Sequence, residues 1–508
     1  MLITLAAPAF AGTWYIENGD ITVKAGETKG TNKVSQGANQ EVEDTNTIIT
    51  NENKDTASSN TVTIETNDKV EVTLKDVNID TSSRNKAAVS VTGSGNTTIK
   101  LDGDNALKSD TYRSGIYGSG SGSLTISGGE NDSLTAQGGS GADGISSSGS
   151  LTISGGTVTA NGDDGGRGIS SSSGVTISGG STVTANGGSG TISGGDGIWS
   201  GGGVTISGGS TVTANGGNGG SLVGGDGIRS GGGLTVSDGT VTAKGGNGDS
   251  KDGYGGDGIR SGGVVTISGN TVNAAGGYGG KVGGYGICSF DRVAISGGTV
   301  NAAGGNDGNG NYSYGGSGIH SVSGSIDLSG SLELTAKAGS PTGKALLQNG
   351  RELDLDTIKD KLGPGAKVTA TDANGETKQV SVPRPVEPEG PVIPEDSSSS
   401  SDGGSAAPSA PTSPLPGLTV TDKDGQRISY TSTQSGNALT VCVGRLTASL
   451  RISLAALRQM RAEGIETITF QTILCSTTLS VDELLAMGGE DAEAVLTHRF
   501  TDSSLTVG

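Results

Sequence analysis

The chain has 508 residues, 95 of them glycine, with 3% aromatic residues and a net charge of −19. This acidic balance argues against a protein that binds nucleic acid or an anionic membrane surface. The sequence contains no uninterrupted apolar run of about 18 residues, so it predicts no membrane-spanning helix.

Residues 1–11 form an apolar stretch that ends in Ala9-Phe10-Ala11. A short apolar segment followed by small residues is typical of the end of a secretion signal, although the usual basic leader is absent here. We therefore interpret residues 1–11 as the remnant of a signal peptide and expect a secreted, extracellular protein. A native apolar N-terminus is the alternative interpretation.

Residues 12–110 contain short stretches in which apolar and polar residues alternate, for example residues 62–64, 70–74 and 98–101. Alternation with a period of two and many β-branched residues indicates half-buried strands. Trp14 and Tyr15 lie at the start, where a repeat protein needs a cap. We predict that this segment forms the N-terminal cap and entry coils of a solenoid.

Residues 111–344 repeat one three-part pattern: a Gly-Ile pair, a strand of the type in residues 175–178 and a strand of the type in residues 182–185. Successive Gly-Ile pairs are separated by 29, 24, 29, 30, 31, 28 and 32 residues. A period between about 20 and 50 residues is the signature of a solenoid. Three short strands in each coil predict an all-β fold, a right-handed parallel β-helix. The glycine-rich connections are expected to stay mobile, because glycine loses the most freedom on ordering.

The alternation within each strand also predicts which side chains point into the β-helix. Three aliphatic ladders are expected to form its core, with one rung in each coil. They are Ile145, Ile169, Ile198, Ile228, Ile259, Ile287 and Ile319; Ile126, Ile153, Ile177, Ile206, Val236, Ile267 and Ile295; and Val158, Val183, Val212, Val241, Val272 and Val300.

Three further segments follow the repeats. Residues 345–382 contain a short helical pattern and a hairpin around Asn374-Gly375, and are predicted to form the C-terminal cap. Residues 383–416 are rich in proline and serine, as expected for a linker. Residues 417–508 lose the glycine repeat, and Ser453 is a plausible N-cap for a helix that ends at Gly464. We predict a small α+β domain there.

An aspartate recurs just before the Gly-Ile pair of three successive coils, at Asp196, Asp226 and Asp257. Stacked carboxylates are candidate calcium ligands, since calcium takes six to eight oxygen ligands. The alternative is an ion-pair ladder with the residues that follow the isoleucines. These residues include Trp199, Arg229 and Arg260, which are candidate ligand-binding positions. No cofactor other than calcium is indicated.

The connections before the Gly-Ile pairs carry tyrosines towards the C-terminal end of the repeat region. Exposed tyrosine can stack on a sugar ring and donate a hydrogen bond, so these residues are candidate ligand-binding residues. Packing of each ring on its own glycine-rich turn is the alternative. The tyrosines are Tyr254, Tyr278, Tyr285, Tyr312 and Tyr314.

The sequence contains few residues in patterns typical of enzyme active sites. The two histidines, His320 and His498, lie in different predicted domains, and neither a nucleophile triad nor a zinc-ligand spacing occurs. No catalytic residue is therefore assigned.

Cys442 and Cys475 could form a disulfide, whereas Cys288 lies at an outward position with no local partner. Paired threonines such as Thr182 and Thr184 form outward rows that resemble those of ice-binding solenoids, but threonine is also simply a good strand former.

The phrases at residues 121–127, 133–136 and 194–198 resemble those of glycine-rich β-helix proteins exported by Gram-positive gut-type bacteria. The resemblance covers roughly residues 60–345. It implies a fold similar to that of pectate lyases and, loosely, carbohydrate binding. We expect an extracellular adhesin or glycan-binding scaffold on or near the bacterial surface. The alternatives are a polysaccharide lyase or hydrolase that uses the aspartate column, and a purely structural spacer.

Overall fold

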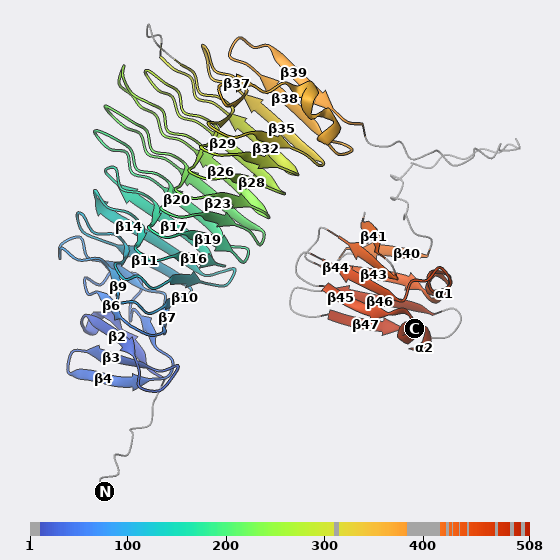
Figure 1. Cartoon of the computed structure of the whole chain (residues 1–508). Helices are drawn as coiled ribbons and strands as arrows, with labels where there is room; N and C mark the ends of the chain where they lie inside the picture. The colour runs from blue at the N-terminus through green and yellow to red at the C-terminus, as the bar shows by residue number, and fades with distance from the viewer. Residues whose placement is uncertain are drawn as a thin grey trace, which may run out of the picture. The chain divides into compact units, whose positions relative to one another are not determined.

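The computed structural model describes residues 11–308, 314–383 and 417–507, with gaps at 423–425, 429, 436, 444–446, 473–475, 488–491 and 499–502 (Figure 1). The chain divides into two compact units, Met1–Pro388 and Glu389–Gly508. We call the first the solenoid and the second the C-terminal domain, and describe each by itself. Residues 1–10 and 384–416, which include the predicted signal remnant and most of the predicted linker, lie outside the described residues.

The solenoid is a parallel β-helix of about 13 turns, as the repeat predicts. Each turn contributes one strand to each of three long sheets (Figure 1). The first sheet consists of β1 (Thr13–Tyr15), β5 (Ile48–Thr50), β7 (Val70–Lys75), β10 (Thr97–Asp102), β13 (Leu124–Ser127), β16 (Leu151–Ser154), β19 (Val175–Ser178), β22 (Val204–Ile206), β25 (Leu234–Val236), β28 (Val265–Ile267), β31 (Val293–Ile295) and β34 (Ile326–Leu328).

The second sheet carries the strands of the Thr-Val-Thr-Ala type. It consists of β8 (Asn78–Asp80), β11 (Asp104–Lys108), β14 (Ser133–Ser140), β17 (Thr157–Asp163), β20 (Thr182–Asn186), β23 (Ser210–Asn215), β26 (Gly239–Lys244), β29 (Thr271–Ala275), β32 (Gly298–Ala303), β35 (Leu332–Lys337), β38 (Lys367–Thr371) and β39 (Thr377–Ser381).

The third sheet carries the Gly-Ile strands and has an antiparallel pairing at each of its own two edges. It consists of β2 (Ile21–Ala25), β3 (Asn32–Gln36), β4 (Asn39–Asp44), β6 (Val62–Glu65), β9 (Val89–Thr92), β12 (Ile116–Gly118), β15 (Ile145–Ser147), β18 (Ile169–Ser171), β21 (Ile198–Ser200), β24 (Ile228–Ser230), β27 (Ile259–Ser261), β30 (Ile287–Ser289), β33 (Ile319–Ser321), β36 (Leu346–Gln348) and β37 (Arg351–Glu352).

The three predicted aliphatic ladders form the core of the solenoid. Equivalent residues pair in register between neighbouring coils, for example Ile198 with Ile228 and Val183 with Val212. Every member of the ladders is at most 1% exposed. Burying such a side chain contributes roughly 1.5–3 kcal/mol, so each coil is held by the aliphatic side chains that it stacks on its neighbours.

A ladder of buried serines at the third-sheet strands was not predicted. Ser171 is fully buried, and its hydroxyl lies 2.9 Å from the carbonyl oxygens of Gly149 and Gly174. Ser200 and Ser230 contact turn carbonyls in the same way. These hydroxyls satisfy backbone acceptors at a corner where the strand ladder ends, so a polar residue can occupy the core.

The glycine-rich connections that join the second sheet to the third are ordered by hydrogen bonds, contrary to expectation. We call them glycine lobes. Within one lobe the Gly195 amide donates to the Gly188 carbonyl (2.9 Å), and the Gly217 amide of the next lobe donates to Gly195 (2.8 Å). A Cβ atom on Gly217 would lie 2.1 Å from the Gly188 oxygen. Only glycine therefore permits such close backbone approach.

Antiparallel strands lie at both ends of the solenoid. At the start, β2, β3 and β4 are antiparallel, and Trp14 is buried with its Nε1 donating to Asp44 (2.7 Å). At the end, the 3-10 helix η2 (Leu355–Lys361) precedes the antiparallel hairpin of β38 and β39. A further short 3-10 helix, η1 (Ile16–Asn18), follows β1. Antiparallel caps cover the open edges that would otherwise pair with another chain.

The C-terminal domain is mostly β, with two short helices where the sequence predicts them. α1 (Leu454–Ala462) is capped by Ser453, whose hydroxyl accepts from the Ala456 amide (3.2 Å), and α2 is Val481–Met487. Phe470 lies fully buried in the core. One sheet holds β40 (Leu418–Thr421), β43 (Ala448–Ser453), β46 (Glu493–His498) and β47 (Ser503–Val507); the other holds β41 (Thr431–Ser435), β42 (Ala438–Cys442), β44 (Thr467–Gln471) and β45 (Ser476–Ser480).

The predicted disulfide of the C-terminal domain involves a residue outside the described ranges. Cys475 lies outside the described residues, so its pairing with Cys442 stays a prediction. Across the described part of the chain, no helix is long and apolar enough to cross a membrane.

Candidate functional site

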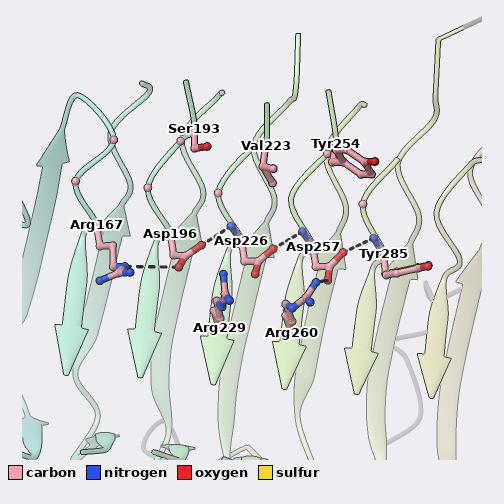
Figure 2. Close-up of a pocket in the computed structure, with 18 of the residues that line it drawn as sticks. Arg167, Ser193, Asp196, Val223, Asp226, Arg229, Tyr254, Asp257, Arg260 and Tyr285 are labelled. Carbon is pink, nitrogen blue, oxygen red and sulfur yellow. Dashed lines mark hydrogen bonds and ion pairs between the residues drawn. The ribbon is translucent and has the colours of Figure 1, made fainter. Parts of the chain in front are cut away.

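A groove of about 930 Å³ runs along the solenoid between the glycine lobes and the third sheet (Figure 2). Its lining comes from six successive lobes, those that contain Gly141, Gly166, Gly195, Gly225, Gly255 and Gly284. Since strands of neighbouring coils lie about 4.8 Å apart, five such steps give a length of about 24 Å. The groove is therefore long enough for an extended polymer.

The three recurring aspartates form a row along the floor of this groove (Figure 2). Asp196, Asp226 and Asp257 are 7%, 6% and 4% exposed. Each Oδ1 accepts a hydrogen bond from the backbone amide at the same position of the next coil: Asp226 donates to Asp196 (2.8 Å), Asp257 to Asp226 (2.7 Å) and Tyr285 to Asp257 (2.7 Å). One oxygen of each carboxyl group therefore extends the hydrogen-bond ladder between neighbouring coils past the ends of the strands.

Arginines pair with the two outer aspartates of the row. Arg167 Nε lies 3.7 Å from Asp196 Oδ2 in the next coil, and Arg260 Nη1 lies 3.3 Å from Asp257 Oδ2 in its own coil. The ion-pair alternative to a calcium site thus describes part of the column. The central Asp226 has no ion-pair partner within 4.0 Å among the described residues. Arg229, on the same wall as Arg260, is exposed and likewise makes no ion pair or hydrogen bond there.

Burial shifts the ionisation of the row towards the protonated form. It raises the pKa of Asp196, and it raises the pKa of Asp257 to about 6. The pKa of Asp226 is raised well above its usual range, first by burial and then by the neighbouring charges of Asp257 and Asp196. Desolvation disfavours the charged form of a carboxyl group, so the middle of the floor retains a proton most readily.

The aspartate row is where the sequence predicts a calcium site, and some of its carboxyl oxygens already have protein partners. Among the described residues, no group of three or more histidine, cysteine, aspartate or glutamate side chains is placed to hold a metal ion. One oxygen of each aspartate accepts a backbone hydrogen bond, and arginines contact the second oxygens of Asp196 and Asp257. Calcium binding stays a prediction, and no step below depends on it.

The lobes supply an apolar wall opposite the arginines. Val223, Tyr254 and Val282 occupy equivalent positions in three successive lobes, because isolated bridges link Val223 to Tyr254 and Tyr254 to Val282. Tyr254 is 39% exposed, and Lys281 Nζ lies 5.7 Å from its ring centroid. Figure 2 shows Val223 and Tyr254 on the lobe side of the aspartate row, with Arg229 and Arg260 on the other side. The groove thus combines an apolar wall with a charged floor.

The structure separates the predicted ligand-binding residues into two groups. Tyr254, Tyr285, Arg229 and Arg260 line the groove. Trp199, Tyr278 and Tyr314 are absent from its lining, and Tyr312 lies outside the described residues. The Arg167 guanidinium stacks 4.3 Å from the Trp199 ring, which leaves one face of that ring covered. Tyr278 and Tyr314 are exposed at 41% and 59%.

At the C-terminal end of the groove, the lining residue Tyr285 packs against another ring. Tyr285 contacts His320 with ring centroids 4.7 Å apart, and burial raises the pKa of Tyr285 to about 12. Cys288 shares the outward column of Arg260 and His320, as predicted, but is only 2% exposed. Burial raises the pKa of its thiol well above the usual range, so it remains a thiol at neutral pH.

Four lining residues other than glycine were missed at the sequence level: Arg167, Ser193, Val223 and Val282. Arg167 could have been found, because it precedes Gly168 as the aspartates precede their glycines. Val223 and Val282 stand where Tyr254 stands in its lobe, but lobes of unequal length hide that correspondence in the sequence. The predicted threonine rows are also present, in register across β17, β20, β23 and β26.

Comparisons of this chain with protein-family models, with curated proteins and with solved structures find no match. The solenoid itself is a scaffold fold that is compatible with a structural or a binding role. The groove is therefore the feature of the molecule from which a function is inferred.

Proposed function

We propose that this chain is an extracellular β-helix scaffold that binds a glycan chain in the groove along the glycine lobes. The observation that carries the proposal is the pairing of an apolar wall, which includes Tyr254, with polar groups on the floor and far wall. A sugar ring has apolar faces and a rim of hydroxyl groups. Aromatic and aliphatic side chains pack against the faces, while carboxyl and guanidinium groups satisfy the hydroxyls.

The length and direction of the groove favour a polymer over a single sugar. Six successive lobes line it, at steps of about 4.8 Å, and an aspartate recurs at one position of three successive coils. Location outside the cell is supported by the Ala9-Phe10-Ala11 pattern at the start of the chain. A role as an adhesin near the bacterial surface follows from binding and export together and forms part of the same proposal.

The test is binding of the full chain to a panel of soluble polysaccharides, measured by affinity electrophoresis and calorimetry. Tyr254→Ala should weaken binding about tenfold, since an aromatic contact contributes on the order of 0.5–1.5 kcal/mol beyond the apolar area that it covers. Tyr117→Ala is the matched control, because Tyr117 is an exposed tyrosine of β12 away from the groove (43% exposed). Absence of binding to every polysaccharide, or an equal loss in both variants, would refute the proposal.

Hydrolysis of the bound glycan is a second candidate, which the aspartate row favours. Retaining glycosidases place two carboxyl groups about 5–5.5 Å apart, one of them protonated, and neighbouring coils are separated by about 4.8 Å. Asp226 has a strongly raised pKa and lies between two other carboxyl groups. Release of new reducing ends that ceases in Asp226→Asn, with binding retained, would support hydrolysis. No release from any polysaccharide that binds would exclude it.

A further inference from the structure

The two limbs of the glycine lobes carry the same kind of hydrogen-bond ladder, but with different side chains. On the limb that follows the second sheet, Asn218 Oδ1 accepts from the Asn247 amide (2.8 Å), and Asn247 Oδ1 accepts from the Tyr278 amide (2.9 Å). On the limb that precedes the third sheet, Asp196 and Asp226 make the equivalent contacts with the next coil. An amide side chain is therefore sufficient for such a ladder, and the ladder alone does not explain why the groove floor carries carboxyl groups.

A carboxyl group adds a second oxygen that can hold or release a proton. The Oδ1 atoms of Asp196, Asp226 and Asp257 accept backbone hydrogen bonds, and all three side chains line the groove. They occupy equivalent positions of successive coils, which are separated by about 4.8 Å, and each is at most 7% exposed. Like charges held so close together in a poorly hydrated site repel one another strongly, so ionisation of the whole row is unfavourable.

The arginines that face the aspartate row are Arg167, Arg229 and Arg260. Their charges offset only part of the cost of ionisation. Burial raises the pKa of Asp196 against the charge of Arg229, and it raises the pKa of Asp257 to about 6 against the charge of Arg260. Burial and then the two neighbouring carboxyl groups raise the pKa of Asp226 well above its usual range, although Arg260 opposes them. The row therefore holds protons at a pH at which ordinary carboxyl groups have lost theirs.

Other titratable side chains line the groove or adjoin it: Asp143, Tyr254, Lys281, Tyr285, Cys288 and His320. The carboxyl oxygens of Asp143 accept from a backbone amide and a serine hydroxyl. Burial raises the pKa of Tyr285 to about 12 and the pKa of the Cys288 thiol well above its usual range, so both stay protonated at neutral pH. Burial lowers the pKa of His320, which packs on Tyr285 and is absent from the lining, so this histidine requires a control of its own.

A glycan in the groove would change the proton affinity of the row. It would replace water at the second carboxyl oxygens, and removal of water disfavours the charged form of a carboxyl group. The protonated form loses no hydrogen bond in exchange, because its O–H group can donate to a sugar oxygen. An occupied groove should therefore hold protons more tightly than an empty one. Since such coupling is reciprocal, protons should also raise the affinity for the glycan.

We propose that the groove is a proton-linked glycan site, in which the aspartate row takes up a proton when a glycan binds, so that binding tightens as the pH falls. This inference rests on the proposed glycan binding and specifies how that site is regulated. Asp257, with a pKa of about 6, places the change between pH 5 and pH 8. If the glycan raises the pKa of one such group by about one unit, the affinity at pH 5 should exceed that at pH 8 at least fivefold.

Calorimetry of the full chain tests the inference. The probe is the tightest-binding polysaccharide of the panel without amino sugars, so that no group of the glycan titrates near pH 6.5. Titrations at this pH in two buffers of different ionisation enthalpy should show uptake of about half a proton for each glycan bound. The affinity should also rise at least fivefold from pH 8 to pH 5. Release of protons, or equal affinity at both pH values without uptake, would overturn the inference.

Variants assign the linkage to the row. A chain with Asp196→Asn, Asp226→Asn and Asp257→Asn keeps the acceptor oxygens, as the asparagine ladder does, and its affinity should change less than twofold between pH 5 and pH 8. His320→Gln removes the neighbouring histidine and should retain the full pH dependence. Full dependence in the triple variant, or its loss in His320→Gln, would overturn the inference. If the triple variant does not fold, proton uptake by the unaltered chain and by His320→Gln decides the question.

Failure of this inference is distinct from failure of the proposed function. A polysaccharide that binds with the same affinity at both pH values, without proton uptake, leaves a glycan site without proton linkage. Tyr254→Ala should weaken binding at both pH values and leave their ratio unchanged, because the aspartate row is intact. Absence of binding across the whole panel refutes the groove as a glycan site and the inference with it.

Discussion

Replacing Asp257 by asparagine should change how the stability of the solenoid depends on pH. The Asp257 side chain is buried, its Oδ1 accepts from the Tyr285 amide (2.7 Å), and burial raises its pKa from 3.8 to about 6. Asparagine keeps an acceptor oxygen for the same amide but does not titrate. The comparison therefore reports the cost of ionising Asp257, together with the effect of its charge on the neighbouring Asp226.

The sign and the size of this pH dependence follow from the raised pKa of Asp257. An unfolded chain releases this proton near pH 3.8, whereas the folded chain holds it to about pH 6. Stability is therefore fully present below pH 3.8 and is lost as the pH rises through 6. The difference of about two units corresponds to roughly 3 kcal/mol at about 1.4 kcal/mol per unit. Between pH 4 and pH 7.5, the unfolding free energy of the wild type should fall by about this amount relative to the variant.

The assay is urea unfolding of both chains at several pH values, followed by tryptophan fluorescence. Both tryptophans, Trp14 and Trp199, belong to the solenoid, so this signal reports on that unit alone. Asp252→Asn, an exposed aspartate of the same coil region, serves as control and should show no pH-dependent difference. A constant difference between Asp257→Asn and the wild type, or a difference that favours the wild type at higher pH, would refute the reasoning.

Three other changes test the fold itself. Gly246→Ala should destabilise the solenoid by about 1–3 kcal/mol or more, because its Cβ would lie 1.9 Å from the Gly217 oxygen. Gly174→Ala should have little effect on the same fluorescence transition, because its Cβ would lie 3.5 Å from the Gly203 oxygen. Ile228→Ala should cost about 2–5 kcal/mol in urea unfolding, since the side chain is fully buried; a loss below about 1 kcal/mol would contradict its place in the core. Ser453→Ala should remove about 1 kcal/mol of helix capping and raise amide hydrogen exchange in α1 about fivefold, with no change in the tryptophan transition.

The core of the solenoid could be predicted from the sequence because two independent periods agree. Alternation within a strand fixes which side chains point inward, and the repeat fixes which residues stack. Ile198 and Ile228 are therefore placed by local pattern alone, and the structure pairs them in register. The caps and the helix after Ser453 were predicted for a similar reason, since their signals are also local.

The groove could be predicted only in part, because its shape depends on how the lobes fold. The recurrence of Asp226 and its neighbours was evident in the sequence. Their burial, however, results from the lobes that cover them, and no local sequence pattern predicts how the lobes fold. Trp199 was expected to bind a ligand, yet Arg167 from the preceding coil stacks on its ring. Such contacts depend on side chains one coil apart, whose spacing in the chain varies with lobe length.

The glycine lobes also constrain how this protein can diversify. Most positions along the lobes tolerate no side chain, since a Cβ atom on Gly217 or Gly246 would collide with a neighbouring carbonyl. Inherited change in ligand preference is therefore confined to the few side chains that face the groove, such as those at positions 223, 254 and 282. Duplication or loss of a whole coil, by contrast, retains the repeated strand pairing and alters the length of the groove. Evolution of this chain would thus change the groove's length by whole coils, and would change its lining by substitutions at a few positions along one wall.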